Sequence, residues 1–314
     1  MKIAVLEPLG VSDEMLRSLF AEEIGAADVE IVTYPDRRED EASLIERSAD
    51  ADIVVVSNIA YPASVMEKNP NLKYVCVAFT GYDHVDMAYC REKGILVSNC
   101  AGYSTVAVAD LVFGLLLDVC RNISALNERV REGGTKDGLV GPELEGKRFG
   151  VVGAGAIGTR VMRIAQAFGC EVVAYSRTEK DIPGVRFVGL DELLSTSDIV
   201  SLHVPQTPET LALIDADKIA LMKPSAILIN CARGPIVDSA ALAAALDEGR
   251  LAGAGIDVLE MEPPFPSDHP LLTCKNAIVT PHVAFASNEA MEKRAVIVAS
   301  NVASYLAGAA RNLV

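Results

Sequence analysis

The feature that most constrains this chain is the segment FGVVGAGAIGTRVMRIAQAFG, residues 149–169, in which an apolar strand runs into three spaced glycines and then into a helix. Gly153 permits a tight turn, Gly155 lets a diphosphate approach the backbone, and Gly158 lets helix and strand pack closely. The helix, which opens with Ala156 and Ile157, would direct its N-terminal N–H groups at the phosphates. A glycine turn without a ligand is the alternative, but the flanking strand and helix favour a dinucleotide site.

Short apolar strands alternate with amphipathic helices along most of the chain, which predicts an α/β fold built from doubly wound parallel sheets. With 314 residues the chain is long enough for two domains. The expected strands of a first series are Lys2 to Leu6, Ile53 to Val56, Tyr74 to Val77 and Ile95 to Ser98. These strands could form one sheet by themselves.

A helical run from Ser104 to Ile123 leads into a polar, glycine-containing stretch, and a second series of strands and helices begins at Arg148. Its expected strands are Phe149 to Val152, Glu171 to Tyr175, Ile199 to His203, Ala226 to Asn230, Gly255 to Val258 and Ala277 to Val279. A final helix is expected from Asn288 to Leu306, with Ser287 as its N-cap.

Composition narrows the class of protein. The net charge of −15 disfavours a nucleic-acid partner, because phosphate backbones are bound by clustered Lys and Arg. No apolar run reaches the ~18 residues that cross a bilayer, so no membrane association is expected. The amino terminus lacks the pattern of a secretory signal, and the seven cysteines include no C-x-x-C pair. A reducing, cytoplasmic setting is therefore expected.

The residues after the strand that ends at Tyr175 bear on the choice of cofactor. An acidic side chain there would bind the adenosine ribose hydroxyls of NAD, but this sequence has Ser176, Arg177 and Thr178. A guanidinium and two hydroxyls can receive a 2′-phosphate, so NADP(H) is favoured and NAD(H) remains possible. The alternative is that Arg177 is a solvated cation that stacks on adenine.

Three titratable residues stand where later apolar strands end, which is where open α/β sheets bind ligands. Arg233 follows one strand, Glu262 follows the next, and His282 follows the last. Reduction of a 2-keto acid requires a cation for the carboxylate and carbonyl, a proton donor, and a carboxylate that orients the donor. Each residue alone could be structural, but together, downstream of a dinucleotide motif, they indicate this chemistry.

The chain resembles the D-isomer-specific 2-hydroxyacid dehydrogenases over essentially its whole length. The matching stretches are FTGYDHVD, NCAGYSTVAVAD, VVGAGAIG, LHVPQTPET, LINCARGPIVD, GIDVLEMEPP, HPLL and TPHVAFAS. The resemblance implies hydride transfer between NAD(P)H and a small 2-keto or (R)-2-hydroxy carboxylic acid. It implies that Arg233 binds the substrate carboxylate and carbonyl, that His282 is the general acid and base, and that Glu262 pairs with His282.

The resemblance also implies ligand contacts. Phe79, Thr80 and Gly81 would bind substrate, the latter two through backbone amides near the carboxylate. The expected cofactor contacts, besides the glycine loop and residues 176–178, are Thr105, His203, Val204, Pro205, Thr210, Cys231, Ala232, Asp257 and His282. Asp257 would bind the nicotinamide amide. Cys231 would pack against the cofactor, because no base stands beside it. No metal is expected.

The implied architecture is a flavodoxin-like substrate domain, residues 1–100 plus 285–314, with a Rossmann cofactor domain, residues 101–284, inserted into it. A homodimer would form through the cofactor domain, using the apolar helix near Val106 to Val119. Val77 and Phe79 stand where phosphoglycerate dehydrogenases have Arg and Gly, so a small or apolar 2-keto acid is expected instead of phosphoglycerate. A dinucleotide-sensing binding protein on this fold, or a formate or phosphite dehydrogenase, are the alternatives.

Overall fold

The computed structural model describes residues 1–25 and 28–314 and confirms the predicted α/β fold with two doubly wound, wholly parallel sheets. Packing divides the chain into two units, residues Met1–Ser104 with Ala286–Val314, and residues Thr105–Phe285. The second unit is therefore inserted into the first. The substrate and cofactor roles expected of these two stretches remain predictions.

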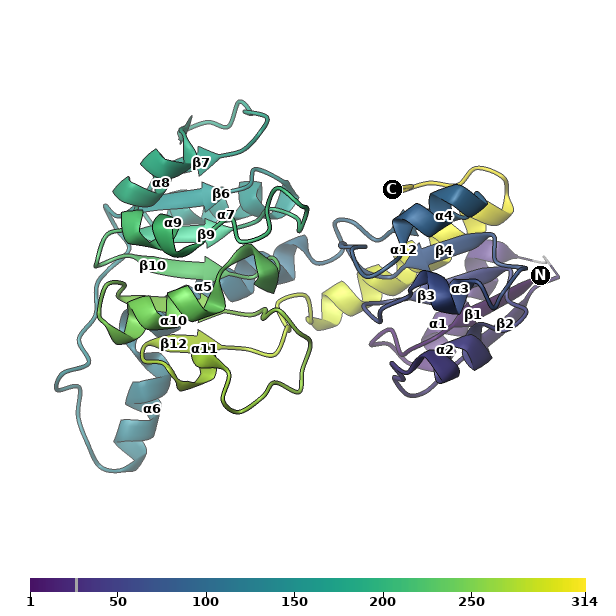
Figure 1. The fold of residues 1–314 in the computed structure, drawn as a ribbon, viewed down its shortest axis with the longest axis horizontal. Helices are drawn as coiled ribbons and strands as arrows, with labels where there is room; N and C mark the ends of the chain where they lie inside the picture. Colours follow the sequence, from purple (N-terminus) through teal and green to yellow (C-terminus); the bar gives the residue numbers. More distant parts are fainter. Residues whose placement is uncertain (26–27) are drawn as a thin grey trace. The chain divides into compact units, whose positions relative to one another are not determined.

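The first unit is built on a five-stranded sheet of order β2-β1-β3-β4-β5. Its strands are β1 (Lys2–Val5), β2 (Glu30–Thr33), β3 (Ile53–Val56), β4 (Tyr74–Val77) and β5 (Leu96–Asn99). Its helices are α1 (Asp13–Ile24), α2 (Glu41–Ser48), α3 (Ala63–Met66), α4 (Met87–Lys93) and α12 (Asn288–Leu306). Helix α12 packs on α1 and on β4, behind the sheet as drawn in Figure 1, while α2 and α3 pack together in front of it.

The second unit is built on a seven-stranded sheet of order β12-β11-β10-β9-β6-β7-β8. Its strands are β6 (Arg148–Val152), β7 (Glu171–Tyr175), β8 (Val185–Phe187), β9 (Ile199–Leu202), β10 (Ile227–Asn230), β11 (Gly253–Ile256) and β12 (Ala277–Val279). Its helices are α5 (Thr105–Arg121), α6 (Ile123–Arg131), α7 (Ala156–Ala167), α8 (Leu190–Thr196), α9 (Ala216–Leu221), α10 (Ser239–Asp247) and α11 (Pro270–Thr273), with a 3-10 turn at Gly234–Ile236.

Side chains that alternate along the strands of this second sheet enter two separate cores. Phe149 and Val151 pack with α5 and α7 on one face. Val152 and Leu228 pack with α8, α9 and α10 on the other face. A strand that is apolar on both sides is the pattern expected of a parallel sheet covered by helices, which Figure 1 shows.

Most predicted elements agree with the structure, and the differences have physical reasons. Helix α12 begins after Ser287, whose hydroxyl accepts the N–H of Ala290 at 3.1 Å, as predicted. The expected helical run to Ile123 is wrong in one respect, because Asn122 adopts a left-handed conformation that separates α5 from α6. Strand β11 begins at Gly253, two residues before the expected start at Gly255. Strands β2 and β8 lie at sheet edges and were not expected.

Candidate functional site

The glycine loop after β6 is shaped by close backbone contacts. Gly153 has φ +107°, and a Cβ there would lie 2.5 Å from the carbonyl oxygen of His203. A Cβ on Gly158 would lie 2.0 Å from the carbonyl oxygen of Gly153. The Gly153 N–H donates to the carbonyl of Tyr175 at 2.8 Å. Only glycine fits these two positions, so the turn is held tightly against β7 and β9.

Gly155 differs, because the structure places no described atom within 4 Å of the position that its Cβ would take. It is the N-cap of α7 and supplies no side-chain cap. Within the described residues, the N–H groups of Ala156, Ile157 and Gly158 have no hydrogen-bond acceptor. An open backbone surface in front of a helix N-terminus with free donors fits the diphosphate of a dinucleotide.

Residues 176–178 follow β7 and lie at the same end of the sheet as the glycine loop, which follows the adjacent strand β6. Ser176 is half-buried, whereas Arg177 and Thr178 are exposed. A hydrogen bond with Thr207 and the charge of Arg177 lower the pKa of Glu209. The charge of Arg177 therefore acts on the loop that follows β9, in which Glu209 lies.

The loop after β9 carries several of the predicted cofactor contacts. His203 donates its backbone N–H to Val152 at 2.7 Å, and its Nε2 lies 2.8 Å from the hydroxyl of Ser201. Burial lowers the pKa of His203 to about 3, so its imidazole is neutral at pH 7. Val204 and Pro205 follow it. The hydroxyl of Thr210 donates to the carbonyl of Pro205 at 2.7 Å and closes the loop.

Two further predicted cofactor contacts follow β10, and one begins α5. The Cys231 thiol is buried, and burial raises its pKa well above the usual range, so it is a neutral thiol and no nucleophile. Ala232 donates its N–H to the side chain of Asn230 at 3.0 Å. Thr105 is half-buried at the first turn of α5.

Arg233 is held by the end of β10. The Asn230 amide donates to the carbonyl oxygen of Arg233 at 2.9 Å, and Nη1 of Arg233 donates to the carbonyl of Ala232 at 2.9 Å. A Cβ on the next residue, Gly234, would lie 1.9 Å from the carbonyl carbon of Leu259. The Arg233 segment therefore packs directly on the backbone that leads from β11 to Glu262.

His282 and Glu262 form a pair. The Nδ1 atom of His282 lies 2.8 Å from one carboxylate oxygen of Glu262 and 3.0 Å from the other. The His282 side chain is 13% exposed, and the ring of Phe285 meets it edge-on at 5.7 Å between centroids. The contact between Nδ1 and the Glu262 carboxylate fixes the orientation of the ring, as a proton donor and acceptor requires.

Asp257 fixes the loop that carries His282. Its carboxylate accepts the Thr280 hydroxyl at 2.6 Å and the backbone N–H groups of Val283 at 2.9 Å and Ala284 at 2.8 Å. The His282 N–H donates to the carbonyl oxygen of Asp257 at 2.8 Å. Burial raises the pKa of Asp257, although these hydrogen bonds act in the opposite direction. These hydrogen bonds of Asp257 hold the loop with His282 at φ +54°, a conformation that non-glycine residues rarely adopt.

The structure thus places Arg233, Glu262 and His282 in the loops that follow β10, β11 and β12, which are consecutive strands of the sheet, and it pairs Glu262 with His282. The predicted substrate residues Phe79, Thr80 and Gly81 lie in the other unit, after β4. Phe79 is buried beside Tyr103, with 6.0 Å between ring centroids. The carbonyl of Thr80 accepts the side-chain amide of Asn99 at 2.7 Å.

Sequence reasoning missed the residues that support the site. Asn230 ends β10 and donates to the carbonyl of Arg233 in the loop beyond it. Asn99 ends β5 and donates to the carbonyl of Thr80 in the loop after the adjacent strand β4. The sequence predicts Asp257 only as a cofactor contact and does not predict its hydrogen bonds with residues 280–284. The available signal was a polar residue at the last position of a strand, as for Asn230 and Asn99, or directly after it, as for Asp257.

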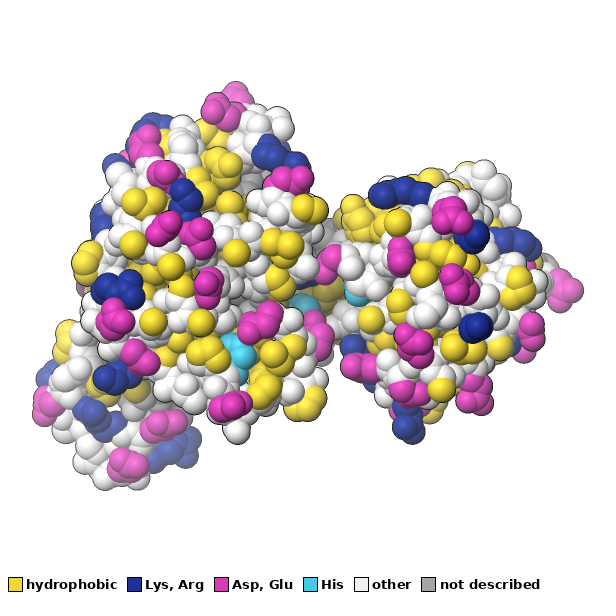
Figure 2. Space-filling view, in the orientation of Figure 1, with side chains coloured by type: hydrophobic (Ala, Val, Ile, Leu, Met, Phe, Trp, Pro, Cys, Tyr) yellow, Lys and Arg dark blue, Asp and Glu magenta, His cyan; other side chains and the backbone are white. Residues whose placement is uncertain are grey.

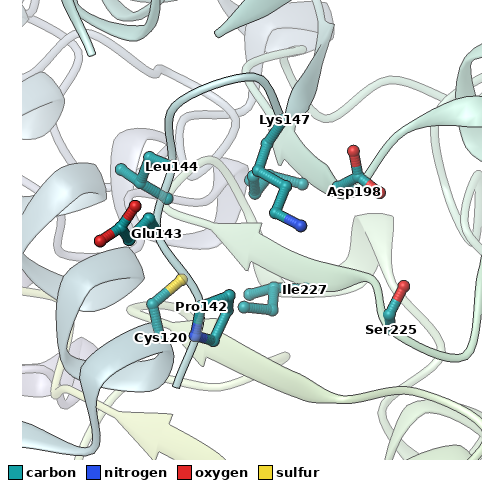
Figure 3. Close-up of a pocket in the computed structure, with 9 residues that line it drawn as sticks. Cys120, Pro142, Glu143, Leu144, Lys147, Asp198, Ser225 and Ile227 are labelled. Atoms are coloured by element: carbon teal, nitrogen blue, oxygen red, sulfur yellow. The ribbon is translucent and has the colours of Figure 1, made fainter. Parts of the chain in front are cut away.

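A hollow of about 70 Å³ lies at the amino ends of strands β9 and β10 of the second sheet. Its lining comes from the end of α5, the segment before β6, and the starts of β9 and β10, as Figure 3 shows: Cys120, Pro142, Glu143, Leu144, Lys147, Asp198, Ile199, Ser225 and Ile227. Ligands of open α/β sheets bind at the carboxyl ends of strands, and this hollow lies at the amino ends. It is not the candidate site.

The surface and the remaining polar groups add little to this picture. Figure 2 shows acidic and basic side chains interspersed over the visible face. Among residues 1–25 and 28–314, no helix is long and apolar enough to cross a membrane. In the same residues, no group of three or more His, Cys, Asp or Glu side chains could hold a metal ion.

Comparisons with known proteins agree with the geometry. Residues 113–284 match the family model described as D-isomer specific 2-hydroxyacid dehydrogenase, NAD binding domain. A hydroxypyruvate reductase of Blautia hydrogenotrophica is 38% identical over 287 residues, covering 88% of each chain. A glyoxylate reductase of Thermofilum pendens is 41% identical over 256 residues, covering 78% of this chain and 75% of the relative.

Among solved structures, an acyclic imino acid reductase in complex with NADPH and D-Arg superimposes with a TM-score of 0.90 and 33% identity over the full length of both chains. The glycine loop that fits a dinucleotide lies within the region that the family model matches. This chain therefore belongs to the D-isomer specific 2-hydroxyacid dehydrogenase family, and its second unit contains the family's NAD-binding domain.

Proposed function

We propose that this protein transfers a hydride between NAD(P)H and C2 of a small 2-keto or (R)-2-hydroxy carboxylic acid. The observation that carries the proposal is the His282–Glu262 pair. The two residues follow β12 and β11, in the same sheet as β10, which Arg233 follows, and β6, which the glycine loop follows. Family membership and the hydroxypyruvate and glyoxylate reductases among its relatives support the reaction class.

In this proposal the nicotinamide, when bound, supplies the hydride to C2 or accepts it from C2. Arg233 binds the substrate carboxylate and polarises the carbonyl, because a guanidinium binds two oxygens of a planar group. His282 donates a proton from Nε2 to the carbonyl oxygen in reduction and removes it in oxidation. Glu262 orients the imidazole through Nδ1. The backbone amides of Thr80 and Gly81 bind the carboxylate.

The cofactor would lie on the glycine loop, with its diphosphate on the N–H groups of Ala156, Ile157 and Gly158. We propose a preference for NADP(H), because Arg177 stands with Ser176 and Thr178 where an NAD enzyme has a carboxylate. The NADPH bound to the imino acid reductase supports this assignment. The remaining contacts would come from Thr105, His203, Val204, Pro205, Thr210, Cys231, Ala232 and Asp257.

The substrate would be a keto acid with a short side chain, such as glyoxylate, hydroxypyruvate or pyruvate. The buried ring of Phe79 occupies the loop that binds the carboxylate, and the neighbouring Val77 provides no cation for a phosphate group. A homodimer through the second unit also belongs to this proposal. Most apolar residues of α5 are buried inside that unit, so the exposed Ile123 and Val130 of α6 are the better contacts.

A cytoplasmic location is also proposed, since a reducing compartment keeps thiols free and all seven cysteines here are free thiols.

A steady-state assay tests the function. Purified protein is mixed with a panel of 2-keto acids and either NADPH or NADH, and the loss of reduced nicotinamide is followed. The proposal predicts turnover of at least one short keto acid, with higher kcat/KM for NADPH, and loss of turnover in His282→Ala. Binding of dinucleotide without turnover of any keto acid, formate or phosphite would instead indicate a sensor, and the enzymatic proposal would be wrong.

A further inference from the structure

We infer that Asn99 is a positioning residue for the substrate carboxylate, because it fixes the orientation of the peptide that joins Thr80 to Gly81. The inference rests on the proposed function and goes beyond it, since Asn99 itself touches no part of the proposed substrate. It concerns only the first unit, in which Asn99 ends β5 and the Thr80 loop follows the adjacent strand β4.

Two successive carbonyl groups of the loop are held from the β5 side. The carbonyl oxygen of Phe79 accepts the backbone N–H of Cys100 at 2.9 Å. The carbonyl oxygen of Thr80 accepts the side-chain amide of Asn99 at 2.7 Å. The first bond continues the ladder of β4 and β5. The second is made by a side chain, so it depends on the identity of residue 99.

These bonds determine where the following N–H groups point. In a trans peptide the N–H is directed opposite to the C=O, and neither of these two peptides is cis. The N–H groups of Thr80 and Gly81 therefore point away from β5. Within the part of the chain that the structure describes, neither has an acceptor, and both residues are only half-buried. Two adjacent donors without a partner on a half-buried loop form a site for a carboxylate.

Asn99 is itself held in a single orientation. Its side-chain oxygen accepts the N–H of Ala101 at 3.4 Å, which leaves the amide nitrogen facing Thr80. Its backbone N–H donates to the carbonyl of Asn312 at 3.1 Å, and its carbonyl accepts the side-chain amide of Asn301 at 3.0 Å. The residue is 7% exposed. The donor that sets the Thr80 peptide is therefore fixed by α12 and by the carboxy-terminal residues.

Substitution of Asn99 should let the peptide between Thr80 and Gly81 rotate, while the rest of the loop keeps its position. Asn99→Asp has the same shape, but its carboxylate cannot donate to the Thr80 carbonyl and repels it. Asn99→Ala removes the donor and leaves space. In either variant the Gly81 N–H is free to rotate away from the carboxylate.

The experiment compares Asn99→Asp and Asn99→Ala with a matched control, Asn69→Ala. Asn69 is also buried in the first unit and donates to the carbonyls of Ser48 and Ala51 at 2.8 Å each, but it lies outside the loop. Four quantities are measured for each protein: KM and kcat for the keto acid, the inhibition constant of oxamate, the dissociation constant of NADPH, and the melting temperature.

We expect both Asn99 variants to raise KM and the oxamate inhibition constant roughly ten- to hundredfold, as expected for loss of a charge-assisted hydrogen bond. The dissociation constant of NADPH should stay unchanged. Asn69→Ala should lower the melting temperature and leave KM unchanged. If one Asn99 variant does not fold, the other provides the same comparison, and Asn99→Ser replaces both if neither is stable.

Three results would overturn the inference. One is an unchanged KM in a folded Asn99 variant of an active enzyme, which would leave the proposed function intact. Another is a rise in KM for Asn69→Ala equal to that of the Asn99 variants, which would indicate general loosening of the unit. A wild-type protein that reduces no keto acid would remove both this inference and the proposed function.

Discussion

One methyl group added to the glycine loop at Gly155 should weaken binding of the cofactor without destabilising the fold. At Gly155 the backbone has φ −70° and ψ −169°, which any residue adopts, and no described atom lies within 4 Å of the added Cβ. Gly155→Ala should therefore leave the fold intact, and the loss of unfolded-state freedom should stabilise it by about 0.4–1 kcal/mol. The same methyl would stand where the diphosphate approaches the backbone.

Gly158→Ala is the matched variant, because it adds the same methyl group three residues away. There the Cβ would lie 2.0 Å from the carbonyl oxygen of Gly153, so α7 must move away from β6. Overpacking of this kind costs about 1–3 kcal/mol. For a unit of this size, a loss of 1 kcal/mol lowers the melting temperature by about 2–4 °C.

The assay measures the melting temperature without cofactor and the dissociation constant of NADPH by fluorescence titration. Gly155→Ala should melt at or slightly above the wild-type temperature and bind NADPH at least about tenfold more weakly, which is ~1.4 kcal/mol. Gly158→Ala should melt several degrees lower. The reasoning is refuted if Gly155→Ala binds NADPH as wild type does, or if it loses as much stability as Gly158→Ala.

Three further predictions concern other parts of the chain. His282→Asn should lower kcat by about 10²–10⁴-fold, and Glu262→Gln by about ten- to hundredfold, with NADPH affinity unchanged; unaltered kcat in either variant would contradict their roles. Arg177→Ala should lower kcat/KM for NADPH, but not for NADH, by about tenfold or more; equal losses would refute a phosphate contact. Asp198→Asn should destabilise the protein by ~1–3 kcal/mol at pH 7, as measured by urea unfolding.

The Asp198 prediction has a defined pH dependence. Partial burial raises the pKa of this carboxyl, but the Arg148 N–H at 2.8 Å and the Lys223 ammonium at 2.9 Å outweigh burial, so the pKa is lowered. A carboxyl whose pKa is lower in the folded state stabilises that state above its unfolded pKa, and the stabilisation is lost as pH falls through the folded pKa. Asp198→Asn should therefore lose less stability than wild type on acidification below about pH 4. An identical acid profile in both proteins would contradict this account.

The parts of the fold that sequence could predict are those with a strong local pattern. Strands such as Ile53–Val56 and Glu171–Tyr175 are apolar runs with clear ends, and α12 has a cap and helical spacing. Strand β8 is three residues long at a sheet edge, and its sequence, VRF, carries no such signal. Short edge strands depend on tertiary pairing, so a local pattern does not predict them.

The same distinction applies to the candidate site. Arg233, Glu262 and His282 could be proposed from strand ends because reactive groups stand out against apolar sequence. The contacts that orient them could not, because the Asp257 carboxylate reaches Val283 and Ala284 across strands that are adjacent only in the folded sheet. The separation of α5 from α6 was missed for a related reason, since one left-handed residue, Asn122, interrupts an otherwise continuous helical pattern.

The most direct test of the central claim is a transfer experiment with NADPH that carries deuterium at C4 on the reactive face. The protein is incubated with this cofactor and the best keto acid of the panel other than glyoxylate, whose reduced product has no stereocentre without the label, and the product is analysed by mass spectrometry and chiral chromatography. The account predicts an (R)-2-hydroxy acid that carries one deuterium at C2. An unlabelled product, or the (S) enantiomer, would contradict it.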